Sequence, residues 1–230
     1  RLLGTPESAH FACSGAGVAD LYEVGAVTGG NDTALRSQLD RLATLRPRPD
    51  AVLVMVGGND LGFSSTLAHC LLVGLLPGAC YSTGDLRATL ARIRQLGPRL
   101  EAAYRDIAHR SGARVVVVTY PRLFPAAGSA GARVGCHWLD RGSQARIVEA
   151  GAALNDEILR RARAAGVESV DAFDAFTGHE LCTRHSMLVR VDVVHGLLAY
   201  SAHPNGAGQH MLAELVGAAL ARHEAAGEAA

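Results

Sequence analysis

The sequence predicts an α/β fold, a three-layer sandwich with a parallel sheet and helices on both faces. Residues 51–56 (AVLVMV) and 114–119 (RVVVVT) are nearly continuous aliphatic runs, which are typical of parallel strands buried on both faces. The segments between such runs carry apolar residues at three- and four-residue spacing, as amphipathic helices do. Strands that alternate with helices indicate a parallel sheet, with ligands bound at the carboxyl ends of its strands.

The remaining elements follow the same patterns. Residues 167–172 (VESVDA) predict a third strand, and residues 9–13 predict a shorter one.

Helical spacing covers residues 85–109, where the Gly-Pro pair at 97–98 is expected to kink or split the helix. It returns at 143–165 and at 206–223, and Asn205 is placed to cap this last helix.

Length and composition predict one domain spanning residues 1–230, with residues 224–230 as a disordered Ala-rich tail. Hydrophobic residues make up 49% of the chain and charged residues 19%, which is a globular composition. The 22 basic residues balance 22 acidic ones, so no net charge favours nucleic acid. No apolar run approaches the roughly 18 residues that span a membrane, and no signal peptide is recognisable.

Five cysteines are spread along the chain without C-x-x-C pairs or zinc-finger spacing, so no structural metal is expected. Cys70 and Cys80 bracket a short apolar loop, which suits a local disulfide. Cys136 and Cys182 fall in loop-like segments and could pair. Cys13 is left over, either as a free buried thiol or with a partner outside this chain.

A VGGND segment at residues 56–60 directly follows the first aliphatic run. Its glycines allow a sharp turn, and the Asn59 amide is a neutral donor that can stabilise a developing oxyanion. Asp60 can cap the next helix or hold the loop. The alternative is an ordinary Gly-rich turn.

Two further segments carry potential chemistry. In FACSGAG (residues 11–17) the Gly15 N–H can be a second oxyanion donor, although a simple small-residue turn fits as well. In SAHPNG (residues 201–206) His203 lies on a loop before the last helix, where an exposed imidazole can act as a general base. The alternative is one more solvated or structural histidine among ten.

Together these segments resemble the SGNH, or GDSL-type, hydrolases, and in particular their actinobacterial secreted esterase/lipase branch. The motifs ACSGA, GGND followed by GF, TYPRLF, FTGHELC and HPNGAGQ occur in the order which that branch uses, over residues 9–216. The resemblance implies a flavodoxin-like sandwich and hydrolysis of carboxylic esters by serine acyl transfer without a cofactor.

The resemblance also assigns roles. Gly15 and Asn59 would form the oxyanion hole and His203 would be the base. Tyr200 stands where the family usually has an Asp, so the backbone carbonyl of Ser201 or Tyr200 would orient the imidazole instead.

The family's Gly-Asp-Ser block, which bears the nucleophile, occurs nowhere in the sequence. The resemblance implies a framework of three disulfides. Cys70–Cys80 and Cys136–Cys182 match two of them, and Cys13 would pair with a cysteine upstream of this sequence. The missing Gly-Asp-Ser block and the missing partner of Cys13 both indicate an N-terminally truncated domain that lacks its nucleophile strand. Ser14 is the weaker alternative as nucleophile.

We therefore expect a secreted, monomeric hydrolase of small-molecule or lipid esters that needs no metal or cofactor and binds neither nucleic acid nor a membrane stably. These 230 residues alone are expected to be inactive and prone to aggregate. The rivals are a non-catalytic relative acting as a binding or structural module, and a phospholipase or polysaccharide deacetylase on the same scaffold.

Overall fold

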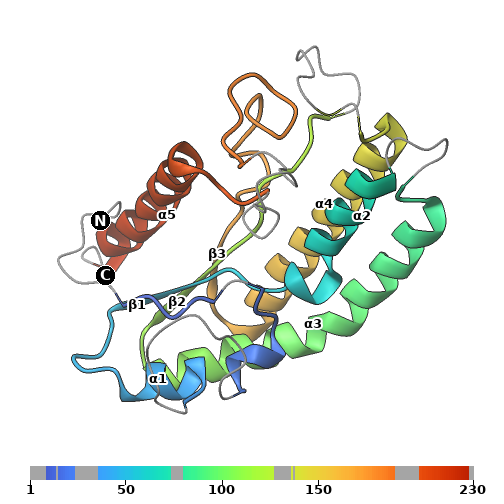
Figure 1. The fold of residues 1–230 in the computed structure, drawn as a ribbon. Coiled ribbons are helices and arrows are strands. Elements are labelled where there is room, and N and C mark those ends of the chain that lie inside the picture. The colour runs from blue at the N-terminus through green and yellow to red at the C-terminus, as the bar shows by residue number, and fades with distance from the viewer. Residues whose placement is uncertain are drawn as a thin grey trace.

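The protein is a three-layer α/β sandwich built on a short parallel sheet. The computed structural model describes residues 9–13, 15–23, 36–73, 80–126, 136, 138–189 and 202–227. Three strands, β1 (Ala51–Val54), β2 (Arg114–Val118) and β3 (Glu168–Val170), pair in parallel in the order β1-β2-β3. The helices are η1 (Ala19–Leu21), α1 (Gln38–Thr44), η2 (Asn59–Leu61), α2 (Phe63–Val73), α3 (Thr83–Ser111), α4 (Arg141–Ala165) and α5 (Gly206–Gly227). The sheet lies between α5 and the group α1, α3 and α4 (Figure 1).

The alternation of side chains along β2 produces the two cores of the sandwich. Val115 and Val117 pack into a cluster with buried residues of α1, α3 and α4. Val118 belongs to a second cluster that includes Leu212 and Val216 of α5. Because successive side chains of a strand point to opposite faces, a strand covered on both sides needs a continuous aliphatic run. The three longer predicted strands are thus confirmed, each somewhat shorter than expected.

The predicted strand at residues 9–13 is wrong. This segment is irregular, and no strand in the described part of the chain pairs with it. It is held instead through Phe11, which packs against the core of β1 and α3 and lies under the guanidinium of Arg41 at 4.6 Å. A strand requires a ladder partner for its backbone groups, and aliphatic composition alone does not supply one.

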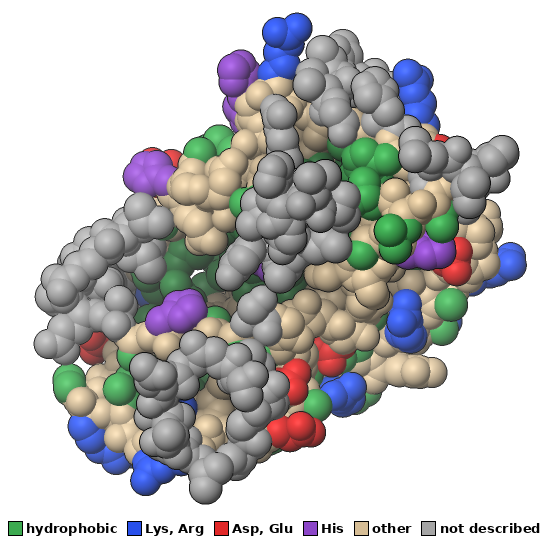
Figure 2. Space-filling model, viewed as in Figure 1, with side chains coloured by type: hydrophobic (Ala, Val, Ile, Leu, Met, Phe, Trp, Pro, Cys, Tyr) green, Lys and Arg blue, Asp and Glu red, His purple; other side chains and the backbone are tan. Residues whose placement is uncertain are grey.

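One edge and one face of β1 are open in the described structure. β1 pairs only with β2 among the described strands. Leu53 and Met55, which alternate with the buried Val54, are 42% and 40% exposed. Figure 2 shows a hollow lined by apolar side chains between α5 and the strands. An exposed strand edge beside apolar side chains is a surface that proteins normally cover.

The long helix α3 is not split at its Gly-Pro pair. It continues through Pro98 from Thr83 to Ser111, because buried residues on both sides of the proline pack into one core with α4. Gly97 has a separate role, since a Cβ there would overlap the Glu157 carboxylate of α4. The glycine therefore permits the close approach of the two helices.

The last helix, α5, is capped as predicted. The Asn205 side-chain oxygen accepts the Gly208 N–H at 3.1 Å, which satisfies one of the unpaired donors of the first turn. The helix runs to Gly227, inside the stretch 224–230 expected to be a tail, and residues 228–230 lie outside the described part.

The hydroxyl of Tyr104 yields a stability prediction. Tyr104 is fully buried in α3, and its hydroxyl has no hydrogen-bond partner among the described residues. Burial raises the pKa of Tyr104, so the group stays neutral and unpaired. An unsatisfied buried polar group costs about 1–3 kcal/mol. Tyr104→Phe in the complete protein should therefore raise the free energy of unfolding by about 1 kcal/mol, measured by denaturant titration.

The matched control is Tyr81→Phe. The Tyr81 hydroxyl is also buried but donates to Thr89 Oγ1 at 2.7 Å, so its removal should lower stability by about 1 kcal/mol. Equal losses in the two variants would contradict an unpaired Tyr104 hydroxyl.

Candidate active site

The predicted Asn59 turn follows β1 immediately and is built on two glycines and a 3-10 helix. Gly57 has φ +117°, a backbone conformation that favours glycine. Gly58 donates its N–H to the Tyr120 hydroxyl at 3.1 Å. The helix η2 then begins at Asn59 and is closed by Gly62 in the left-handed conformation. The turn therefore projects Asn59 at the carboxyl end of β1, where the sequence predicts it.

The Asn59 side chain joins this turn to the segment that contains Gly15. Its Nδ2 donates to the carbonyl of Ala16 at 2.9 Å, and the residue is exposed. One amide hydrogen is thus used to fix the side chain, and the second is left for another acceptor. Gly15 has φ +80° and open space around its Cα. The structure therefore brings together the two predicted oxyanion segments. Ser14 lies outside the described residues.

Asp60 supplies a second link between the same two segments. Both of its carboxylate oxygens accept the Val18 N–H, at 3.2 and 3.0 Å, and Arg99 lies 3.8 Å from one of them. A Cβ at Gly17 would come within 2.9 Å of the carboxylate, so glycine is needed for this approach. Of the two predicted roles of Asp60, the structure confirms the one in which it holds the loop.

His203 is exposed on the loop before α5, and this loop is held by backbone hydrogen bonds to Val189. Its backbone carbonyl accepts the Val189 N–H at 2.8 Å, and Ala202 N–H donates back to Val189 at 2.9 Å. Ala202 has φ +62°, a strained conformation for a residue with a side chain. Tyr200 and Ser201, the predicted orienting carbonyls, lie outside the described residues. The loop is therefore fixed by short antiparallel pairing immediately before α5.

Arg122 connects the loops that follow β2 and β3. Its Nη2 donates to Thr177 Oγ1 at 3.0 Å and lies 3.2 Å from Asp174 and 3.4 Å from the buried Glu180. Its backbone N–H donates to the Phe173 carbonyl at 2.9 Å. These contacts join the TYPRLF and FTGHELC motifs. Because the strands are parallel, the Asn59 turn after β1 and the Arg122 bridge between the segments after β2 and β3 lie at the same edge of the sheet.

Both predicted disulfides are present. Cys70–Cys80 links the end of α2 to the start of α3, and Cys136–Cys182 links the segment before α4 to the loop after β3. Cys13 is a free, half-buried thiol whose Sγ lies 3.6 Å from the Phe11 carbonyl. All four disulfide-bonded cysteines belong to or pack against the cluster that includes Val118 of β2 and Leu212 of α5.

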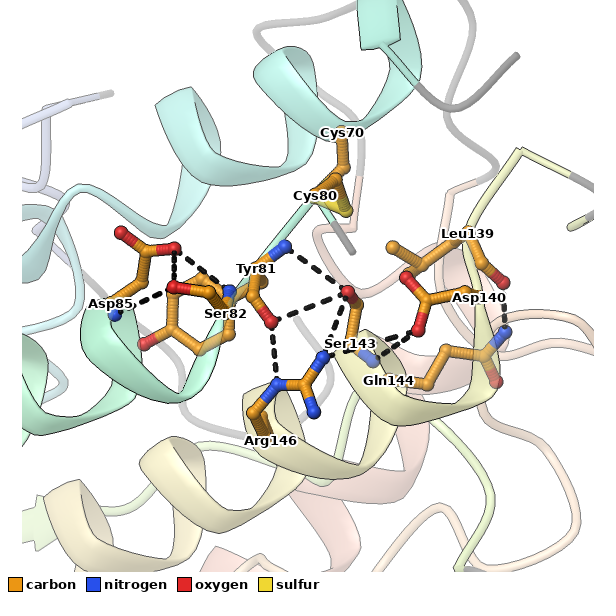
Figure 3. Close-up of polar contacts among 10 residues, drawn as sticks. All are labelled: Cys70, Cys80, Tyr81, Ser82, Asp85, Leu139, Asp140, Ser143, Gln144 and Arg146. Carbon is orange, nitrogen blue, oxygen red and sulfur yellow. Dashed lines mark hydrogen bonds and ion pairs between the residues drawn. A yellow bond between two sulfur atoms is a disulfide. The ribbon is translucent and has the colours of Figure 1, made fainter. Parts of the chain in front are cut away.

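The residue after Cys80 is fixed to α4 by a buried polar cluster (Figure 3). The Ser143 hydroxyl accepts the Tyr81 N–H at 3.1 Å, and Arg146 Nε donates to the Tyr81 carbonyl at 2.5 Å. This cluster was not expected from the sequence. It joins the Cys70–Cys80 disulfide to α4, and through the disulfide also α2, the helix that follows the Asn59 turn.

Within the described ranges, no group of three or more His, Cys, Asp or Glu side chains is arranged to hold a metal ion. None of the helices described there is long and apolar enough to cross a membrane.

The first turn of α5 allows a test of how the His203 loop is held. A Cβ at Gly208 would overlap the Met187 carbonyl oxygen, which accepts the Asn205 N–H, and would lie 3.0 Å from the Phe176 ring. Gly208→Ala should therefore lower the free energy of unfolding by about 1–3 kcal/mol through overpacking, measured by denaturant titration. Gly206→Ala, which meets open space, should be neutral. Equal behaviour of the two variants would contradict this packing.

Comparison with known proteins places the chain in a family. The model of the GDSL-like lipase/acylhydrolase family matches residues 1–211. Lipase 1 of Streptomyces coelicolor is 31% identical over 208 residues, which are 89% of this chain and 67% of that protein. A lipase of Streptomyces rimosus is 33% identical over 175 residues, 74% of this chain and 59% of that protein.

Two crystal structures share the fold at somewhat lower identity. The extracellular lipase of Streptomyces rimosus superposes with a TM-score of 0.63 at 28% identity, covering 88% of this chain and 78% of that one. Phospholipase A1 of Streptomyces albidoflavus gives a TM-score of 0.69 at 27% identity, covering 90% and 77%. The chain thus belongs to the GDSL-like lipase/acylhydrolase family.

Proposed function

We propose that this chain is the greater part of a secreted esterase or lipase that hydrolyses carboxylic esters of small molecules or lipids by serine acyl transfer. The observation that carries the proposal is the Asn59 amide, held against the Ala16 carbonyl at the end of β1 and beside Gly15. A neutral donor fixed in this way is suited to a developing oxyanion. Family membership and the lipase relatives support the reaction class.

In the proposed mechanism, His203 removes the proton of a serine hydroxyl as the serine attacks the ester carbonyl. The N–H of Gly15, the amide of Asn59 and the N–H of the nucleophile itself stabilise the tetrahedral oxyanion. His203 then returns the proton to the leaving alcohol, and water hydrolyses the acyl-enzyme by the same steps. The carbonyl of Ser201 or Tyr200 orients the imidazole.

The serine is proposed to come from a segment outside these 230 residues, because the sequence contains no Gly-Asp-Ser block. Among the described strands β1 pairs only with β2, and this edge together with the exposed Leu53 and Met55 supports a strand that docks there. Secretion is supported by the two disulfides, which persist in oxidising compartments.

The decisive substitution is Asn59→Ala in the complete enzyme. Because Asn59 is exposed, the fold should survive, while turnover of p-nitrophenyl esters should fall roughly 100- to 1,000-fold through loss of an oxyanion donor. The matched control is Thr44→Ala in α1, which also removes hydrogen bonding by an exposed side chain, to the Asp40 carbonyl at 3.0 Å, and should leave turnover unchanged. Near-normal turnover in Asn59→Ala would exclude the assigned role.

A second test concerns the source of the serine. The 230 residues expressed alone should not hydrolyse p-nitrophenyl esters and should aggregate, because in the described part of the chain one edge of β1 has no partner strand and Leu53 and Met55 are exposed. Addition of a segment bearing Gly-Asp-Ser should restore activity. A soluble, active 230-residue protein would contradict an external nucleophile and point to Ser14. A complete protein that binds esters but never hydrolyses them would support the non-catalytic alternative.

A further inference from the structure

Tyr120, directly after β2, contacts the turn that carries Asn59. Its hydroxyl accepts the Gly58 N–H at 3.1 Å, across 62 positions of sequence. Its ring lies against the same glycine, where a Cβ would come within 3.1 Å of Cζ and 3.2 Å of Cε1. The Gly57–Gly58 peptide, directly before Asn59, is therefore held by a side chain from the segment that follows the neighbouring strand.

Tyr120 is itself fixed by one buried side chain of α4. The Asn155 Oδ1 accepts the Tyr120 N–H at 3.1 Å, and the Asn155 Nδ2 donates to the Tyr120 carbonyl at 2.7 Å. Asn155 is only 3% exposed. Because a single amide satisfies both backbone groups of Tyr120, the residue cannot shift along β2 without leaving buried polar atoms unpaired.

The Tyr120 hydroxyl keeps its proton at neutral pH because its pKa is raised. Burial, with a further contribution from the Asp60 charge, raises the pKa of Tyr120 to about 12, against the smaller opposing effect of the Gly58 N–H. The hydroxyl is thus neutral across the working range of a histidine-based esterase. Its contribution is a hydrogen-bond acceptor held at a fixed place.

We propose that Tyr120 is a positioning residue for ester hydrolysis, which fixes the Gly57–Gly58 peptide directly before Asn59 so that the Asn59 amide is already aimed at the oxyanion before the substrate arrives. The inference rests on the proposed function of Asn59. The turn is also held by two hydrogen bonds to the segment around Gly15, from the Asn59 amide to the Ala16 carbonyl and from the Val18 N–H to the Asp60 carboxylate. The Tyr120 contact adds a third hydrogen bond, from a different segment of the chain. Such preorganisation decides the effect of an oxyanion donor.

The test is Tyr120→Phe in the complete enzyme, which keeps the ring and removes only the acceptor. The kcat should fall roughly 10- to 100-fold with an unchanged KM, since a misplacement of about 1 Å at a catalytic group costs up to about 100-fold. Tyr81→Phe is the matched control, because it loses a buried hydroxyl hydrogen bond with Thr89, away from the Asn59 turn. It should lower the melting temperature and leave kcat unchanged.

A double-mutant cycle separates positioning from general stability. If Tyr120 acts through Asn59, Tyr120→Phe should have little further effect on kcat in the Asn59→Ala background. The positioning role alone would be overturned if the losses in kcat of the two single variants multiplied in the double variant. It would also be overturned if Tyr120→Phe had a normal kcat while Asn59→Ala was impaired. A normal kcat in Asn59→Ala would overturn both the oxyanion assignment and the positioning role that depends on it.

Discussion

The proposed role of the Asn59 amide requires that the turn which carries it keep one conformation, and three long-range contacts at this end of the sheet hold that turn. The turn is held across the surface by the Ala16 carbonyl and by the Asp60 carboxylate on Val18 N–H. It is held from within by the Tyr120 hydroxyl on Gly58. Each contact joins segments distant in sequence, so the geometry of the turn depends on the whole fold.

Three glycines at or near the candidate site are required for the same physical reason, which is the close approach of another group to the backbone. Gly17 makes room for the Asp60 carboxylate, Gly58 for the Tyr120 ring and Gly208 for the Met187 carbonyl. In each case a polar or aromatic group approaches the backbone more closely than a Cβ would allow. The site is thus assembled by close backbone contacts rather than by long side chains reaching across a cleft.

Much of the fold was predictable from local patterns, because aliphatic runs such as 114–118 and the Asn205 cap are determined within a few residues. The loop-holding role of Asp60 and both disulfides were also open to sequence reasoning. Residues 9–13 were mistaken for a strand, since pairing depends on a neighbour that composition does not reveal. Tyr120 and Asn155 were missed, because their partners are 62 and 35 positions away.

The position of the oxyanion tests the role of Asn59 most directly, and it can be measured in a crystal structure of the complete enzyme inhibited covalently with a fluorophosphonate. We expect a phosphonyl oxygen about 2.7–3.1 Å from both the Asn59 Nδ2 and the Gly15 nitrogen, with His203 next to the modified serine. A phosphonyl oxygen directed away from Asn59, or an adduct on Ser14, would contradict it.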